Sequence, residues 1–192
     1  MATTDTVKLH IAGIGHVFYN DVDAAALNLD QFKFLDEDTY GTWTWLGDTS
    51  SENLVEFEVD GGDTTYKRTW DRLKTGVVRE DETVSATINS VNVSAEAFNL
   101  GFKNHVYDEA TKSYTVDSTA GSSEKSILIV MEDGSNIAGL RLPNTDIKGS
   151  FPVFDLEEYT EIPLSVAVLS SPTTGALWQW FEPRQYVAPV GG

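Results

Sequence analysis

The sequence predicts a mainly β protein, an antiparallel β-sandwich or partial barrel with one short flanking α-helix. Three observations support this fold class. Short segments repeatedly alternate apolar and polar residues, which is typical of strands that bury one face. Turn signals rich in Gly, Pro, Asn and Asp separate those segments. A short stretch at 94–101 carries the residues that begin and end a helix.

Length and charge narrow the possible functions. The 192 residues suffice for one domain, expected to span 1–186 with a long hairpin arm near 60–75 and a flexible tail at 187–192. No run approaches the roughly 18 apolar residues of a membrane helix, so no membrane partner is expected. The net charge of −17 disfavours nucleic-acid binding, which depends on Lys and Arg. It suits either a surface that keeps the protein in solution or one that DNA slides past.

The N-terminal part is expected to supply two strands. Residues 7–19 predict a strand that bends at 13–15, and residues 21–34 predict either a helical turn or a surface loop. Residues 40–47 predict the second strand, with three large anchors: Tyr40, Trp43 and Trp45. Paired tryptophans in a strand are more typical of core or interface packing than of a sugar-binding platform.

Residues 52–59 alternate strongly and predict a third strand. One face holds Asn53, Val55, Phe57 and Val59, and the other holds Glu52, Leu54, Glu56 and Glu58. The sequence Asp60-Gly61-Gly62-Asp63 is expected to turn the chain, and residues 64–72 are expected to return it. The basic cluster of the chain lies here, formed by Lys67, Arg68, Arg72 and Lys74.

A strand and the helix are expected next. The strand at 83–93 directs three apolar residues inward: Val84, Ala86 and Ile88. In the helix, Ser94 is the expected cap and Gly101 the expected end. Packing through Ala95, Phe98 and Phe102 is expected to hold its two turns in place.

The centre of the expected sheet is the stretch 123–171. It opens with an apolar run at 126–132, a turn at Asp133-Gly134 and a strand at 136–142. The sequence Pro143-Asn144-Thr145-Asp146 is expected to break this strand. Residues 161–169 alternate cleanly, with an apolar face of Ile162, Leu164, Val166 and Val168. The polar stretch before this centre is expected to bury Tyr107, Tyr114 and Val116, and the last strand, 177–181, is expected to end at Pro183.

The residue patterns that carry catalysis are missing. The three histidines, His10, His16 and His105, are not spaced as metal ligands, and the chain has no cysteine. It also has no G-x-S-x-G elbow and no Gly-rich phosphate loop. Acidic clusters at 36–38, 80–82 and 155–158 could serve glycoside hydrolysis or bind calcium if they converged, but such clusters are more typical of solvated loops. We therefore expect no enzymatic activity, no metal and no cofactor.

Six segments, taken in their order along the chain, resemble a known family. They are 42–53 (TWTWLGDTSSEN), 56–62 (EFEVDGG), 83–91 (TVSATINSV), 146–149 (DIKG), 154–163 (FDLEEYTEIP) and 180–184 (WFEPR). Together they are similar to the major tail tube protein of long-tailed phages (siphoviruses) that infect actinobacteria. The resemblance runs over nearly the whole chain, and its specificity lies in the order of the segments.

The resemblance implies a structural role. It implies hexameric rings of this chain that stack into a hollow tail tube, with edge-to-edge strand pairing between neighbours closing a barrel. DNA would pass through the tube into the host without specific binding. The implied partners are the tape measure protein, the tail terminator and the distal tail protein. The implied location is the virion tail, assembled in the host bacterial cytoplasm.

Two groups of residues are assigned to assembly surfaces on that resemblance. Residues expected to face the lumen are acids and small hydroxyls, which repel or ignore phosphate: Glu52, Glu56, Glu58, Ser85 and Thr87. Residues expected to contact the next ring combine basic side chains with an aromatic anchor: Lys67, Arg68, Trp70, Arg72 and Lys74. Without the resemblance, the first group is interpreted as an ordinary solvated face and the second as a local loop.

Two other functions remain open from the sequence. A carbohydrate-binding β-sandwich module of a baseplate or surface protein would use exposed tryptophans as stacking platforms, with Trp43, Trp178 and Trp180 as candidates. A glycosidase would use a pair of the clustered acids. Quenching of tryptophan fluorescence tests the first alternative, and an activity screen tests the second.

Overall fold

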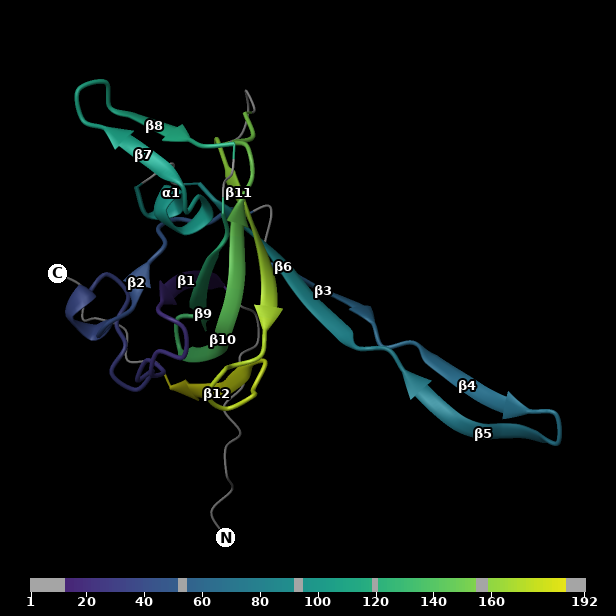
Figure 1. The fold of residues 1–192 in the computed structure, drawn as a ribbon. Coiled ribbons are helices and arrows are strands. Elements are labelled where there is room, and N and C mark those ends of the chain that lie inside the picture. The colour runs from purple at the N-terminus through teal and green to yellow at the C-terminus, as the bar shows by residue number, and fades with distance from the viewer. Residues whose placement is uncertain (1–12, 52–54, 92–94, 119–120, 155–158, 186–192) are drawn as a thin grey trace, which may run out of the picture.

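The computed structural model describes residues 13–51, 55–91, 95–118, 121–154 and 159–185 (Figure 1), and the side chains of 68–69 and 72–75 lie outside this description. The tail expected at 187–192 and most of the strand expected at 7–19 also lie outside it. The helical elements are the 3-10 helix η1 (Glu37–Thr39) and the α-helix α1 (Ala95–Gly101). The strands are β1 (Ile14–Asn20), β2 (Thr44–Trp45), β3 (Glu56–Gly61), β4 (Thr64–Thr69), β5 (Arg72–Arg79), β6 (Glu82–Ser90), β7 (His105–Asp108), β8 (Ser113–Val116), β9 (Ser123–Glu132), β10 (Asn136–Gly149), β11 (Ile162–Leu169) and β12 (Gln179–Gln185).

These elements confirm a mainly β fold with one short α-helix among the described residues. The main sheet is antiparallel and has the order β2-β1-β9-β10-β11-β6-β3, and β12 also pairs with β10. Two hairpins, β4–β5 and β7–β8, form separate two-stranded sheets. In Figure 1, β4–β5 projects far to one side of the body, and β7–β8 lies beside α1.

The long strand β10 folds the sheet over on itself. Its first half pairs with β9 on one side and β12 on the other, whereas its second half exchanges β12 for β11. The pairing with β9 shifts register between Leu142 and Thr145. The prediction that Pro143 breaks this strand was therefore wrong, because the strand continues to Gly149. Proline has no backbone N–H to donate to a strand ladder. Pro143 is tolerated in β10 because it lies in the register shift, where no ladder hydrogen bond from its nitrogen is required.

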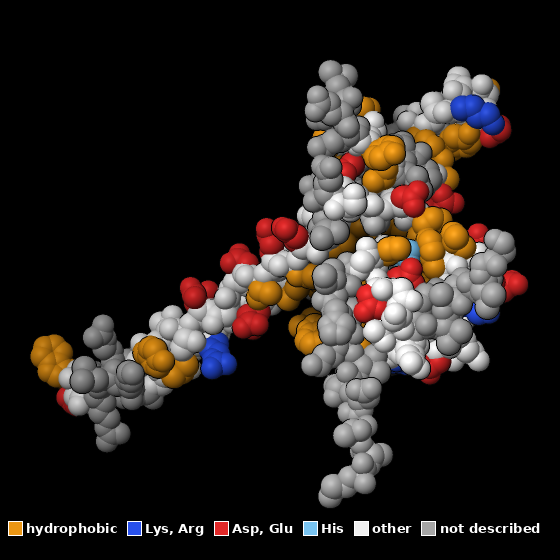
Figure 2. Space-filling model, turned by 180° about the vertical axis from the view of Figure 1, so that it is seen from behind, with side chains coloured by type: hydrophobic (Ala, Val, Ile, Leu, Met, Phe, Trp, Pro, Cys, Tyr) orange, Lys and Arg blue, Asp and Glu red, His pale blue; other side chains and the backbone are white. Residues whose placement is uncertain are grey.

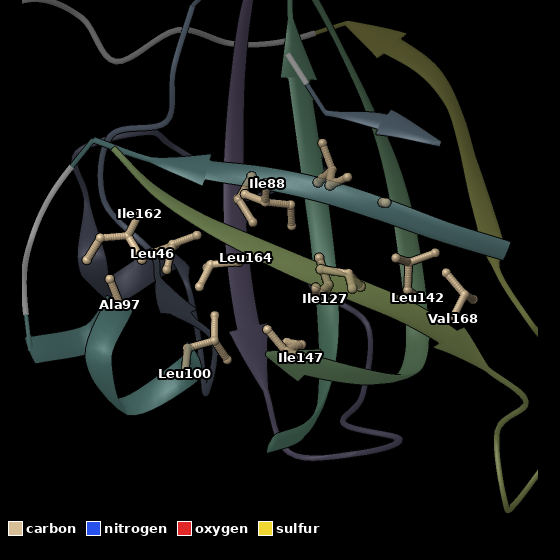
Figure 3. Packing of buried hydrophobic residues seen from close by; sticks show 14 of the residues in the cluster. Leu46, Ile88, Ala97, Leu100, Ile127, Leu142, Ile147, Ile162, Leu164 and Val168 are labelled. Atoms are coloured by element: carbon tan, nitrogen blue, oxygen red, sulfur yellow. The ribbon is translucent and has the colours of Figure 1, made fainter. Parts of the chain in front are cut away.

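The first core lies where the folded sheet packs against itself. The residues of β6 and β11 expected to face inward include Ile88, Leu164 and Val166, all of which are buried. They share a cluster with Ile127 of β9 and Leu142 of β10 (Figure 3). Because side chains alternate along a strand, the opposite faces of β6 and β11 remain exposed. Burial of each such aliphatic side chain contributes about 1.5–3 kcal/mol.

A second, aromatic core covers the other face of β1 and β9. Phe18 and Leu128 point to this side and are fully buried. The segment from 21 to 43 packs on them through Leu27, Leu29, Phe32, Tyr40 and Trp43. Residues 21–34 are a loop, which was one of the two expected alternatives. Tyr40 and Trp43 are buried as expected, but strand pairing in this region is limited to β2.

Of the residues predicted to hold the helix α1 in place, Phe98 and Phe102 pack in the first core and Ala95 does not. Ala97 and Leu100 are buried, whereas Ala95 is exposed. Phe98 is half-buried and packs against the first core. Gly101 lies so close to the sheet that a Cβ atom there would be 2.7 Å from Leu164 Cδ2, so the residue that ends the helix also permits its close packing.

Two further predictions were wrong. Tyr107 and Val116 are exposed, because β7 and β8 pair with each other and not with the main sheet. The last strand does not end at Pro183 but runs to Gln185. Pairing shifts here, with Phe181 opposite Gly139 and Arg184 opposite Ile137, so Pro183 lies in an irregularity where no ladder N–H is required.

His16 is a buried ionisable side chain in β1. Its ring stacks on Phe34 with the centroids 3.6 Å apart, and its Nε2 lies 3.6 Å from a carboxylate oxygen of the buried Glu132. Burial lowers the pKa of His16, and the nearby Glu132 carboxylate opposes this only in part. The folded protein therefore favours the neutral imidazole.

We expect this histidine to make stability dependent on pH. Below about 6.5, the pKa of a solvated histidine, the unfolded chain takes up a proton that the folded chain accepts only at lower pH. The stability that His16 contributes is thus fully present above pH 6.5 and is lost as the pH falls below that value. Denaturant unfolding of wild type and His16→Phe at several pH values measures the difference. A difference that stays constant between pH 7 and pH 5 would contradict the prediction.

Candidate functional site

Four of the five residues predicted to face a lumen lie together on one sheet face. Glu56 is opposite Thr87, and Glu58 is opposite Ser85, in the ladder between β3 and β6. Directly opposed residues of an antiparallel pair point to the same side, and all four side chains are exposed. The fifth residue, Glu52, lies outside the described residues.

This polar face, defined here as the outer face of β3, β6, β11 and the second half of β10, extends beyond the predicted residues. Ser165 of β11 lies opposite Thr87 of β6 on one side and opposite Lys148 of β10 on the other. In the next row, Ala167 lies between Ser85 and Asp146. Asp146 in turn is opposite Glu124 of β9, so acids recur across the whole face.

The sequence predicted the part of the polar face that lies on β11. The alternation at 161–169 placed Ser165 and Ala167 on the face opposite the apolar one. Asp146 and Lys148 were missed because residues 143–146 were interpreted as a break, whereas they continue β10. The polar face thus combines carboxylates, small hydroxyls and one lysine on four adjacent strands.

The second predicted group lies on the β4–β5 hairpin. The sequence Asp60-Gly61-Gly62-Asp63 was predicted to turn the chain, but this was wrong, because β3 continues outward into β4 and β5 leads back into β6. The two glycines have φ angles of 89° and 74° and mark a kink between the two ladders. The chain reverses between Thr69 and Arg72, so Trp70 lies at the tip.

The hairpin has little support from the rest of the chain. Its strands form a sheet of two that pairs with no other strand in the described part of the molecule. Tyr66 and Val77 are opposite each other and both largely exposed, and Trp70 is 103% exposed. An isolated two-stranded hairpin is only marginally stable in water, so packing on another surface would stabilise this arm.

Charge is divided sharply along the arm. The stem, residues 56–63 and 80–82, has seven acids and no base. The distal part, residues 64–79, has five bases against one acid. Figure 2 shows the red acidic side chains along the stem. Of the predicted contact residues, Lys67 is exposed, and the side chains of Arg68, Arg72 and Lys74 lie outside the description.

The remaining candidate chemistry finds little support. Trp43 cannot be a sugar-stacking platform, because it is buried and donates its Nε1–H to the Ala25 carbonyl at 2.9 Å. Trp178 and Trp180 are exposed on and just before β12. The described residues contain no group of His, Asp and Glu suited to a metal. None of their helices has the length and apolar character needed to cross a membrane.

Comparison with known proteins gives a consistent result. A family model described as "Phage tail tube protein" matches residues 1–191. The chain is 28% identical over 140 residues to the major tail protein Gp23 of Mycobacterium phage D29, which covers 70% of each chain. It is 29% identical over 143 residues to the major tail protein Gp23 of Mycobacterium phage L5, again with 70% of each chain covered.

Proposed function

Because this chain belongs to the phage tail tube protein family, we propose that six copies of it form a ring and that such rings stack into the tube of a phage tail. Family membership makes the chain a structural component of the virion tail and not an enzyme. It also means that the chain assembles with itself and with other tail proteins. Ring symmetry, the lumen surface and the contacts between rings are the parts that we propose.

The lumen is proposed to be lined by the polar face. The supporting observation is that Glu56, Glu58, Ser85 and Thr87 share one exposed face with the hydroxyl of Ser165. Carboxylates repel phosphate and small hydroxyls offer it no charge, so DNA would pass without being retained. Pairing between the edges of neighbouring sheets would close the barrel and remove the open edge of β3.

The β4–β5 arm is proposed to hold successive rings together. Its exposed Trp70 is a suitable anchor, since interface energy is concentrated in aromatic and arginine side chains. Its basic distal part would lie against acids of the next ring, which fixes orientation more than affinity. At the ends of the tube we propose contacts with the tail terminator and the distal tail protein, and inside it with the tape measure protein before DNA replaces it.

Electron microscopy of the purified protein tests the proposal directly. We expect concentrated protein, alone or with its natural tail-tip complex, to form hollow tubes whose cross-section has six-fold symmetry. Protein that stays as single particles in both conditions would overturn the assembly. A map that places Lys and Arg along the bore would overturn the assignment of the lumen.

A further inference from the structure

An apolar groove opens at the root of the arm. It encloses about 460 Å³ between β3, Asn89 of β6 and residues 49–51 on one side and β1, β9 and β10 on the other. Its apolar lining includes Ile14, Val55, Phe57, Met131 and Leu140. Phe57 is 39% exposed and Val59, further along the same face of β3, is 64% exposed. Figure 2 shows hydrophobic side chains gathered along the arm and at its root.

The groove lies under an unpaired strand edge. β3 pairs with β6 along one side, and its other side has no partner strand among the described residues. Such an edge exposes a row of backbone N–H and C=O groups that can accept another strand. A strand added there would place every second side chain into the groove and the others on the polar face.

One segment of the chain has the alternation that this position requires. Residues 7–11, which lie outside the described part, read Val-Lys-Leu-His-Ile. Placing Val7, Leu9 and Ile11 in the groove puts Lys8 and His10 on the polar face, beside the carboxylates of β3. A shift by one residue would reverse both placements, so hydrophobic burial and charge pairing favour the same orientation.

We propose that residues 7–11 of a second copy of this chain add as a strand to the free edge of β3 and fill the groove. The proposal rests on the ring assembly proposed above and identifies the segment that joins neighbours. The direction of β1 favours a second copy over the chain's own segment. Gly13 still donates its N–H to the Glu132 carbonyl at 3.0 Å, beyond the last pair, Ile14 with Glu132. The described chain therefore stays in the sheet up to Gly13, level with the turn after β9.

This arrangement propagates from copy to copy. Gly13, Ile14 and Gly15 line the groove, so the described part of each copy begins beside the groove that would receive residues 7–11 of its neighbour. The segment 7–11 and the groove are different surfaces, so the contact between copies is heterologous. A heterologous contact closes into a ring when the rotation between neighbouring copies is a whole fraction of 360°.

Disulfide trapping in a chain without cysteine tests the proposal. Leu9→Cys protein is mixed with Val55→Cys, Phe57→Cys or Val59→Cys protein, assembled into tubes and oxidised with copper phenanthroline. Each protein carries a single thiol, so a disulfide between the two variants joins different copies. Leu9→Cys mixed with Val106→Cys, whose site is exposed on the β7–β8 hairpin, is the matched control.

We expect mixed dimers from at least one groove position and none from the Val106→Cys control. The position that reacts defines the register, since a disulfide requires Cα atoms about 4.4–6.8 Å apart. Tubes that form but yield no mixed dimer at any of the three positions would overturn the inference while leaving the tube function intact. A Leu9→Cys/Phe57→Cys double variant that gives only internally linked monomers would overturn it as well. Absence of tubes from wild type would instead count against the proposed function.

Discussion

Trp70→Ala is expected to yield a folded monomer that no longer forms tubes. The Trp70 side chain is fully exposed at the tip of the arm, so its removal leaves no cavity within the chain. We expect the free energy of unfolding to change by no more than about 0.5 kcal/mol. Loss of an interface anchor costs roughly 2 kcal/mol or more, which weakens each contact between rings about 30-fold. Because every copy in a ring carries the same change, stacking should fail at concentrations where wild type assembles.

Sedimentation and electron microscopy measure the assembly, and denaturant unfolding confirms that the monomer is intact. Trp178→Ala is the matched control, since it removes another exposed tryptophan that lies outside the arm, and it should still form tubes. Trp70→Phe keeps an aromatic anchor and should retain most of the assembly. Normal tubes from Trp70→Ala would show that the arm tip does not join rings.

The parts of the fold that the sequence predicted well are those where a single strand determines the pattern. The alternation at 161–169 identified the buried face of β11, and Val84, Ala86 and Ile88 were correctly directed inward from β6. The same alternation placed Glu56 with Glu58 and Ser85 with Thr87, and the pairing of β3 with β6 brings all four onto one face. Period-two alternation is a local property, so it predicts the faces of each strand but not which strands pair.

The errors arose where the outcome depends on distant parts of the chain. Pro143 lies inside β10, because strands on both sides support the ladder across its register shift. Gly61 and Gly62 are compatible with either a reversal of the chain or a kink in it. The chain kinks here, because β4 pairs with β5 and not with β3. Tyr107 is exposed because β7 and β8 pair only with each other. Hydrophobic patterning cannot distinguish a residue buried in its own chain from one that awaits a partner molecule.

The second large effect is expected from cations placed on the polar face. Ser85→Lys/Thr87→Lys adds two positive charges to each copy at exposed positions on β6. The flanking strands β3 and β11 separate these positions from the sheet edge, so ring closure should be unaffected. If the face lines the lumen, each ring attracts the phosphates that pass it. An added barrier of about 1.4 kcal/mol slows passage tenfold, and many rings act on the same DNA.

We therefore expect phages that carry this double variant to build tails of normal appearance but to lose infectivity by roughly tenfold or more. Ser85→Gln/Thr87→Gln adds similar bulk without charge and should remain close to wild type, which separates electrostatic retention from narrowing of the bore. Raising the ionic strength during DNA ejection in vitro should restore the lysine variant, because salt screens attraction to phosphate and leaves a steric obstruction unchanged. Normal infectivity in phages whose tails contain the lysine variant would place this face outside the DNA path. If the glutamine variant loses as much infectivity as the lysine variant, and added salt does not restore the lysine variant, the electrostatic explanation is rejected.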